Sequence, residues 1–466
     1  MLWLSFSLLT AGLGAGLVLN GGALPQEWNW SILAIALAGL GSRLARRERE
    51  GIADYWITGI LLALPLWVAV QMIPLPQGLV SILSPMRAEI SREAGTTSWI
   101  PLSIAPARTF QWLLNASACA VTFLVIRDLA FVWRRNIWRL TIPILAFGFI
   151  EGALGLYQFY AGRLVRNVQP SSGTWINPDR FSGFLEMVLP LAVTGAFAAW
   201  RSGVLPHEAS GGKALKAAAA LTVAVTCLSG IVVSLSRAGF SGAIVSLAVL
   251  LLIALFAPGA RLASAGIPVT RRITAGLAAI AATSAAFLFL PTDELIARFG
   301  LAVASSQSLS GETRLELWRD TRKLIAAYPL TGSGLGTYES ALMRFKTAAP
   351  MRTADYAHND YLQAAAELGI AGAAIGLIWI ALVFARTLRA STSPVPGSPN
   401  RYLALGLAGS MVAILIHSLV DFNLYMPAEA MVFAWICGLA ASSPLRAQAS
   451  VTSTAAVRVI QSTSLQ

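Results

Sequence analysis

Three histidines are the only imidazole groups in the chain, and two of them stand where chemistry could occur. His358 lies in Ala357-His-Asn-Asp-Tyr-Leu-Gln, between a long polar stretch and an apolar run. An imidazole at a water interface can exchange a proton near neutral pH, which is what a general base must do. His358 is therefore the candidate base. His417 precedes Asp421 by four residues on a shared helical face, and its simplest interpretation is a structural hydrogen bond. The third, His207, is interpreted as a solvated loop residue.

Arginines near the same boundaries form a second candidate group. Arg237 follows Ser234-Leu-Ser236 in a tight turn between apolar runs, where a guanidinium is costly unless it snorkels to water or meets an anion. Arg314 lies on a predicted surface helix, and Arg180 follows Asn177-Pro-Asp179 before another apolar run. Guanidinium groups suit phosphate oxygens because they are planar, permanently charged and bidentate. If these side chains converge, they predict a site for an anionic lipid headgroup.

Membrane helices must position these residues, because the composition excludes most soluble folds. Of 466 residues, 56% are hydrophobic and 12% charged, whereas soluble domains are roughly 25% charged. A span needs about 20 apolar residues, so the sequence predicts an all-α polytopic membrane protein with about twelve transmembrane helices. The predicted spans are residues 2–20, 29–44, 56–75, 109–131, 138–160, 181–200, 216–235, 238–257, 272–290, 359–385, 402–422 and 427–442.

The net charge of +12 follows from membrane topology. Basic residues gather in alternate loops, so the positive-inside rule places both termini in the cytoplasm, and we expect no nucleic-acid partner. Residues 1–442 form the predicted membrane domain, with two long periplasmic segments at 76–108 and 291–358. Residues 443–466 are a polar cytoplasmic tail that we expect to be disordered. The three cysteines lie in apolar runs and predict neither a disulfide nor a metal site.

The two periplasmic segments contain recognisable local patterns. In the longer one, residues 311–325 carry apolar side chains at helical spacing among charges, which predicts an amphipathic helix lying on the outer leaflet. Gly332-Ser-Gly-Leu-Gly336 predicts a flexible turn. The shorter segment contains prolines and predicts short helices or turns at the surface.

Five short motifs follow one another along residues 100–440. They are Pro101-Leu-Ser-Ile-Ala-Pro106, Gly173-Thr-Trp-Ile-Asn-Pro-Asp-Arg-Phe-Ser-Gly, Ser234-Leu-Ser-Arg-Ala-Gly239, His358-Asn-Asp-Tyr-Leu-Gln-Ala-Ala-Ala-Glu-Leu-Gly-Ile-Ala-Gly372 and His417-Ser-Leu-Val-Asp-Phe-Asn. In this order, and on the outer face, they resemble the O-antigen ligase and O-antigen polymerase superfamily of bacterial envelope proteins. After Asn177 the family often has a second Asn and then His, where this chain has Asp179 and Arg180.

The resemblance implies a GT-C-like, metal-independent glycosyltransferase without a cofactor in the bacterial inner membrane. The donor would be an oligosaccharide on undecaprenyl pyrophosphate, and the acceptor another glycan or a lipid A core. O-antigen, lipopolysaccharide or exopolysaccharide biosynthesis would follow, with other envelope-polysaccharide assembly proteins as further partners. The resemblance also implies that His358 acts as the base and that Arg237 and Arg314 bind the pyrophosphate, and we add Arg180 and Asn177 to the substrate-binding group.

Physical reasoning agrees with this reaction. A sugar pyrophosphate leaves readily when fixed guanidinium groups stabilise its developing charge, and a single displacement inverts the anomeric centre. Asp421, near the outer end of its predicted span, is the candidate to support His358 indirectly, with His417 beside it. On an ideal helix starting at His358, Glu367 points the opposite way and predicts a pairing with another helix.

A secondary transporter or a flippase for lipid-linked glycans is the main alternative. Twelve spans with both termini inside fit a transporter well, and fold alone does not decide function. Transporters place ionisable groups near the bilayer midplane, where Glu151 and Glu186 are the main acids of this chain. His358, Arg237 and Arg314 instead lie at the outer rim, which favours transfer. The choice between ligase and polymerase stays open.

Overall fold

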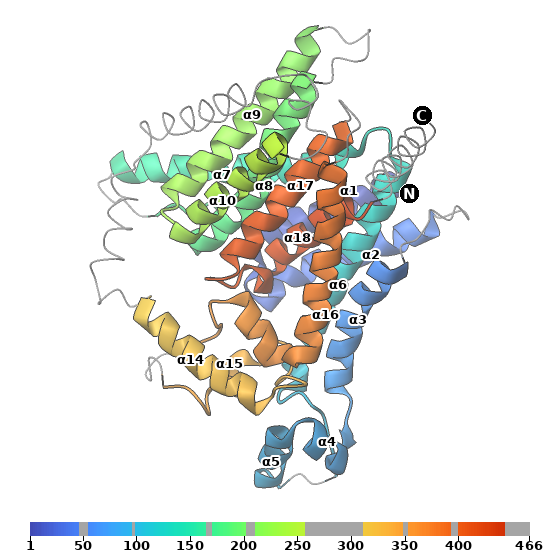
Figure 1. The fold of residues 1–466 in the computed structure, drawn as a ribbon, viewed down its shortest axis with the longest axis vertical. Coiled ribbons are helices and arrows are strands. Elements are labelled where there is room, and N and C mark those ends of the chain that lie inside the picture. The colour runs from blue at the N-terminus through green and yellow to red at the C-terminus, as the bar shows by residue number, and fades with distance from the viewer. Residues whose placement is uncertain are drawn as a thin grey trace, which may run out of the picture.

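The chain folds into a helical bundle with a smaller cap at one end (Figure 1). The computed structural model describes residues 1–45, 55–95, 98–164, 170–201, 210–256, 311–347, 353–392 and 399–442. The bundle contains α1 (Leu2–Val18), α2 (Pro25–Leu44), α3 (Tyr55–Met72), α6 (Pro106–Val132), α7 (Ile142–Leu164), α8 (Pro178–Arg201), α9 (Ser210–Val233), α10 (Arg237–Phe256), α16 (Asp360–Ser391), α17 (Pro399–His417) and α18 (Pro427–Ala440). Short 3₁₀ turns lie at Asn20–Gly22 (η1), Ile137–Thr141 (η2) and Asn423–Tyr425 (η3).

The cap consists of α4 (Gln77–Leu83), α5 (Pro85–Glu93), α14 (Gly311–Ala327), α15 (Tyr338–Leu342) and their connecting loops. It also holds one antiparallel pair of two-residue strands, β1 (Leu75–Pro76) and β2 (Trp99–Ile100). The rest of the described secondary structure is helical, so the predicted all-α class is confirmed and the strand pair is a local addition to it. The two strands flank α4 and α5 in the sequence and pair where the chain returns to α6. They therefore close a connecting segment and are not part of the helical core.

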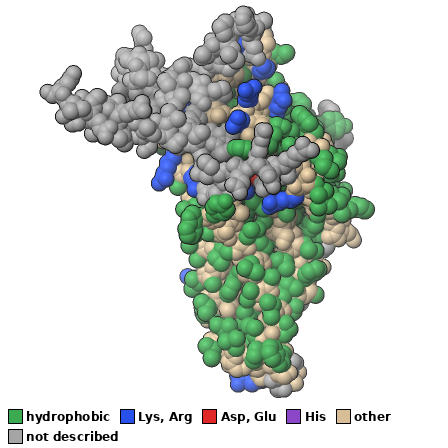
Figure 2. Space-filling model, turned by 90° about the vertical axis from the view of Figure 1, so that its right-hand side faces the viewer, with side chains coloured by type: hydrophobic (Ala, Val, Ile, Leu, Met, Phe, Trp, Pro, Cys, Tyr) green, Lys and Arg blue, Asp and Glu red, His purple; other side chains and the backbone are tan. Residues whose placement is uncertain are grey.

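Eight helices in the described part of the chain are long and apolar enough to cross a membrane, namely α3, α6, α7, α8, α9, α10, α16 and α17. The helices α1 and α18 are apolar but shorter. The predicted span at residues 272–290 lies outside the described residues, and so does the tail at 443–466. The count of twelve spans stays a prediction, whereas the helical, membrane-spanning character is confirmed. Figure 2 agrees: hydrophobic side chains dominate the visible surface, and Lys and Arg gather towards the upper end, opposite the cap.

Proline sets where many of these helices begin. The first residues of α2, α5, α6, α8, α17 and α18 are all proline. Proline suits the first helical position because its fixed φ matches the helix and the N–H that it lacks would be unpaired there anyway. Of the bundle helices, α8 and α17 pack against each other and are the most completely buried of the candidate spans. The site described below lies at one end of this central pair.

The amphipathic helix forms as predicted, but the cap covers two of its apolar side chains. In α14, Leu317 and Leu324 are buried in a cluster with Tyr328, Tyr338 and Leu342 of the cap. Trp318 Nε1 donates a hydrogen bond to the Ala357 carbonyl at 2.9 Å, which ties α14 to the segment before α16. The expected contact with the outer leaflet is therefore wrong for these side chains, because the protein itself covers them.

A break in α16 fixes the loop that was expected to be flexible. Gly369 has φ 67° and ψ 179°, which interrupts the helix after its first turns. The carbonyls of Ala366 and Glu367 then accept hydrogen bonds from the backbone N–H groups of Ser333 and Gly334 at 3.0 and 2.9 Å. The loop between α14 and α15 is thus held against the break, and the prediction of flexibility there is wrong.

The same break changes the role expected for Glu367. Its carboxylate accepts hydrogen bonds from the backbone N–H groups of Gly336 and Tyr338 at 2.9 and 2.8 Å. Glu367 therefore pairs with another helix, as expected, but that helix is α15 of the cap and the partners are backbone N–H groups. Because α16 begins at Asp360 and breaks at Gly369, an ideal helix drawn from His358 is also the wrong description of this segment.

Replacing Gly369 with alanine should destabilise the protein by at least about 1–3 kcal/mol. A Cβ at this position would collide with the Leu330 carbonyl, and the backbone conformation is one that only glycine adopts readily. Thermal unfolding in detergent would measure the change. The control is Gly376→Ala on the same helix, where a Cβ meets nothing within 4 Å. Equal melting temperatures for the two variants would contradict the assigned conformation.

Candidate active site

Three bundle helices begin at the same end of the molecule, each with a side chain that caps it. Asn177 Oδ1 accepts a hydrogen bond from the Asp179 N–H at 2.8 Å at the start of α8. Ser236 Oγ accepts one from the Gly239 N–H at 3.1 Å in α10, and Asn359 Oδ1 accepts one from the Leu362 N–H at 2.9 Å in α16. Helix N-termini attract anions through unpaired N–H groups and the helix dipole. Asn177, predicted to bind substrate, thus has its side-chain oxygen committed to a cap.

His358 lies immediately before α16 and meets Asp421 in the turn that follows α17. Nδ1 of His358 lies 3.2 Å from Oδ1 of Asp421, and 35% of the imidazole is exposed whereas the carboxylate is 2% exposed. Oδ1 also accepts the Phe422 N–H at 3.0 Å. His358 reaches this position with φ 50°, in the left-handed region that is uncommon for residues other than glycine. With Nδ1–H donating to the carboxylate, Nε2 of His358 keeps its lone pair for a proton from substrate.

Asp421 is held in its charged form despite its burial. Burial by itself raises the pKa of a carboxyl group, but the hydrogen bond from His358 and the charges of His417 and Arg314 outweigh it. The pKa of Asp421 therefore lies below its usual range. An ionised Asp421 keeps the proton of His358 on Nδ1, which fixes both the orientation and the tautomer of the ring.

Aromatic rings hold the second side of His358. The His358 ring packs edge-on against Phe422, with centroids 4.9 Å apart at 79°. Tyr356 stacks on Phe422 at 4.0 Å and 6°, and the guanidinium carbon of Arg180 lies 4.6 Å from the Phe422 centroid. Phe422 therefore joins the candidate base to an arginine at the start of α8. Among the described residues, Arg180 Nε is buried without a hydrogen-bond partner, so a donor remains for an anionic ligand.

The other two predicted arginines lie on helices that approach this group. Arg237 is the first residue of α10, which meets α8 closely there: a Cβ on Gly239 would collide with Ser182, two residues after Arg180. Arg314, in the first turn of α14, acts electrostatically on Asp421. Both side chains are half-buried. The structure thus brings Arg180 to His358 through Phe422 and connects Arg314 to Asp421, and it places the first turn of α10 beside that of α8.

The loop after α17 attaches this site to the start of α16. The Asp360 N–H donates to the carbonyls of Ser418 and Asp421 at 3.0 and 3.2 Å. Asp360 Oδ2 accepts the Ser418 hydroxyl at 2.6 Å and the Leu424 N–H at 3.1 Å. These bonds hold residues 358 and 421 at a fixed separation, although they are far apart in the sequence.

His417 lies behind Asp421 and is fully buried. Its Nδ1 is 2.9 Å from Oε1 of Glu186 in α8, and its Nε2 is 3.9 Å from Oδ2 of Asp421. Because α17 ends at His417, Asp421 stands in the following turn and not on the helix itself. The two side chains lie on the same side, as expected, because the Asp421 N–H still donates to the His417 carbonyl at 3.1 Å. Glu186, set aside above as a mid-span acid, is thereby linked to the site.

Comparison with known families agrees with this arrangement. Residues 222–377 match the family described as O-antigen ligase, a range that includes Arg237, Arg314 and His358. Over this range the chain is similar to O-antigen ligases. This confirms the family resemblance of the motifs and supports glycan transfer as the class of reaction. A search of curated proteins finds no significant match.

Several residues of the site have no clear signal in the sequence. Tyr356 and Phe422 are single aromatic residues among many, and Glu186 resembles any other mid-span acid. Caps were the available signal, because Asn177-Pro, Ser236-Arg and Asn359-Asp each mark a helix start. Read together, they would have predicted three helix N-termini at one membrane face.

Proposed function

We propose that this protein transfers a glycan from an undecaprenyl-pyrophosphate-linked donor to an acceptor sugar at the periplasmic face of the inner membrane. The observation that carries the proposal is the partly exposed His358 imidazole, held by a buried carboxylate and packed on Phe422, on which Arg180 also stacks. A base beside fixed cations is what a sugar hydroxyl and a pyrophosphate leaving group require. The family match supports the same class of reaction.

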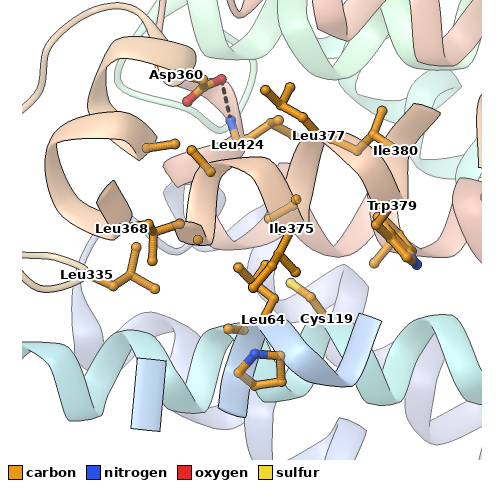
Figure 3. Close-up of a pocket in the computed structure, with 18 of the residues that line it drawn as sticks. Leu64, Cys119, Leu335, Asp360, Leu368, Ile375, Leu377, Trp379, Ile380 and Leu424 are labelled. Carbon is orange, nitrogen blue, oxygen red and sulfur yellow. Dashed lines mark hydrogen bonds between the residues drawn. The ribbon is translucent and has the colours of Figure 1, made fainter. Parts of the chain in front are cut away.

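An apolar groove beside this site supports a lipid-linked donor. It has a volume of about 250 Å³ and lies between α3, α6, α16 and α18. Figure 3 shows its wall of aliphatic and aromatic side chains, including Leu64, Ile375 and Trp379, with Asp360 at one end. Because Asp360 is bonded to the Asp421 loop, the polar end of the groove adjoins the site. A lipid with a charged headgroup and a hydrocarbon chain fits both parts.

The chemistry is a single displacement. Nε2 of His358 takes the proton of the acceptor hydroxyl as the oxygen forms a bond to the anomeric carbon of the donor. The bond from that carbon to the pyrophosphate oxygen breaks, and the pyrophosphate leaves with the electron pair, so the anomeric configuration inverts. Arg180, Arg237 and Arg314 stabilise the charge that develops on the leaving group, and the helix N-termini add to it. We propose that these groups suffice without a divalent metal.

The proposed orientation places both termini in the cytoplasm and the site in the periplasm. Arg43 at the end of α2 and Lys213 and Lys216 at the start of α9 lie at the helix ends opposite the site. An excess of Lys and Arg marks the cytoplasmic side. We therefore propose that residues 1–442 form one membrane domain, with the cap in the periplasm and other envelope-polysaccharide assembly proteins as neighbours.

Reconstitution tests this function. We expect purified protein in proteoliposomes to transfer a labelled oligosaccharide from undecaprenyl pyrophosphate to either a lipid A-core acceptor or a second glycan, with an inverted linkage by NMR. Activity should persist in excess chelator. Absence of transfer to every acceptor, combined with movement of the glycolipid across the bilayer, would establish the flippase alternative. Loss of activity in chelator, with recovery on adding a divalent ion, would overturn the metal-free mechanism.

A further inference from the structure

The buried pair of Glu186 and His417 is not used by the reaction described above. Both side chains are 0% exposed, and they come from α8 and the end of α17. Each nitrogen of His417 faces a carboxylate: Nδ1 lies 2.9 Å from Glu186, and Nε2 lies 3.9 Å from Asp421. Asp421 in turn reaches His358 at 3.2 Å. Four titratable side chains therefore form one network in which carboxylates and imidazoles alternate, from Glu186 to the candidate base His358.

We propose that Glu186 is a positioning residue, which acts through His417 to keep Asp421 in the state that orients His358. The inference rests on the proposed function, because it concerns the same base. An imidazole between two carboxylates is most stable with a proton on each nitrogen, and a buried cation of this kind requires the second carboxylate. Without Glu186, the positive charge beside Asp421 Oδ2 is lost. Asp421 then takes up a proton more easily and ceases to fix the Nδ1–H tautomer of His358.

The buried polar atoms of this network that lack a hydrogen-bond partner support a role beyond packing. In the described residues, His417 Nε2, Asp421 Oδ2 and Glu186 Oε2 are buried without a hydrogen-bond partner. Unpaired buried polar atoms are costly, so a purely structural network would satisfy them. The gap of 3.9 Å instead keeps His417 and Asp421 coupled by charge while leaving Asp421 Oδ1 to its bond with His358.

Other charged groups act on this network from four neighbouring helices, and each stays unchanged in the test below. They are Asp179 and Arg180 at the start of α8, Arg314 in α14, Asp360 in α16 and Glu429 in α18.

The main test is Glu186→Gln, which keeps the size of the side chain and its acceptor oxygen but removes the charge. We expect kcat for glycan transfer to fall on the order of 10-fold, with KM for the donor nearly unchanged. The acidic limb of the kcat profile should move to higher pH, because Asp421 is protonated at a higher pH in the variant. In an Asp421→Asn background, Glu186→Gln should lower kcat little further, because its effect passes through Asp421.

The control is Glu151→Gln. Glu151 is also a buried membrane carboxylate, but it accepts hydrogen bonds from Thr174 at 2.8 and 3.0 Å and is not part of the network that leads to His358. This variant should leave the pH profile where it is. An unmoved acidic limb in Glu186→Gln, or a full multiplicative loss in the Asp421→Asn background, would overturn the proposal. Wild-type protein that transfers no glycan would instead overturn the proposed function, so the two failures are distinguishable.

A second variant tests the network without removing any titratable group. A Cβ on Gly242 of α10 would collide with Glu186 Oε2, so Gly242→Ala should displace the carboxylate from His417. We expect the same shift of the acidic limb as in Glu186→Gln. Gly59→Ala in α3, where a Cβ meets nothing within 4 Å, is the matched control. A profile for Gly242→Ala that coincides with Gly59→Ala would contradict the positioning role.

Discussion

Replacing His358 with alanine should lower kcat for glycan transfer by about 10²- to 10⁴-fold, the range expected when a general base is removed. The imidazole is the one side chain in the described site that combines partial exposure, a buried carboxylate partner and a free nitrogen. Transfer from a lipid-pyrophosphate-linked oligosaccharide in proteoliposomes measures the effect. The amount of protein in the membrane should stay near that of the wild type, because the imidazole is 35% exposed.

His358→Asn separates chemistry from backbone strain. Residue 358 has φ 50°, and asparagine is among the few residues that adopt this left-handed conformation readily. Asparagine can keep a hydrogen bond to Asp421 but cannot accept the proton. We therefore expect His358→Asn to be as inactive as His358→Ala. Near-normal transfer by either variant would remove His358 from the reaction.

Replacing Arg180 with alanine should lower kcat/KM by about 10²- to 10³-fold, as the loss of one fixed donor to a developing anion does in other enzymes. The guanidinium is fixed over Phe422 at 4.6 Å, beside the base, and its Nε has no partner among the described residues. Arg180→Lys should recover only part of the activity. Lysine keeps the charge, but it loses the planar fork and the stacking on the ring.

Arg344→Ala is the matched control for this variant. Arg344 pairs with Glu89 and Glu93 at 3.0 and 3.2 Å on the cap surface, and 42% of its side chain is exposed. Exposed ion pairs contribute little, so transfer should stay near the wild-type rate. If Arg180→Ala and Arg344→Ala have the same kcat/KM, Arg180 does not bind the leaving group. The same comparison applied to Arg237→Ala and Arg314→Ala would rank the three arginines by their contribution to kcat/KM.

Two sequence-based interpretations changed for identifiable physical reasons. The amphipathic pattern of residues 311–325 predicted a helix correctly, but periodicity does not say whether lipid or protein covers the apolar face. Tyr328 and Tyr338 of the cap bury Leu317 and Leu324. The glycines at 332–336 suggested flexibility, but the carbonyls freed by the break at Gly369 hold that loop. In both cases the deciding contacts come from segments that no local pattern could connect.

The sequence by itself determined the membrane character, the family motifs and the class of residues at the outer rim. These follow from local signals: the lengths of apolar runs, proline and cap residues at helix starts, and the type and order of short motifs. They were sufficient to select His358, Arg180, Arg237 and Arg314 as candidates. None of these signals contains the distance between two side chains.

Only the tertiary structure decided which carboxylate serves the base and what lies behind it. His358 and Asp421 are 63 residues apart, and Glu186 and His417 are 231 apart. Such pairs meet because α17 stops at His417, the following turn brings Asp421 towards the start of α16, and α8 packs along α17. Helix ends and packing faces depend on the whole bundle, since burial and hydrogen bonding are satisfied jointly across elements. The charge of Asp421, and with it the tautomer of His358, is consequently a property of the fold and not of any one motif.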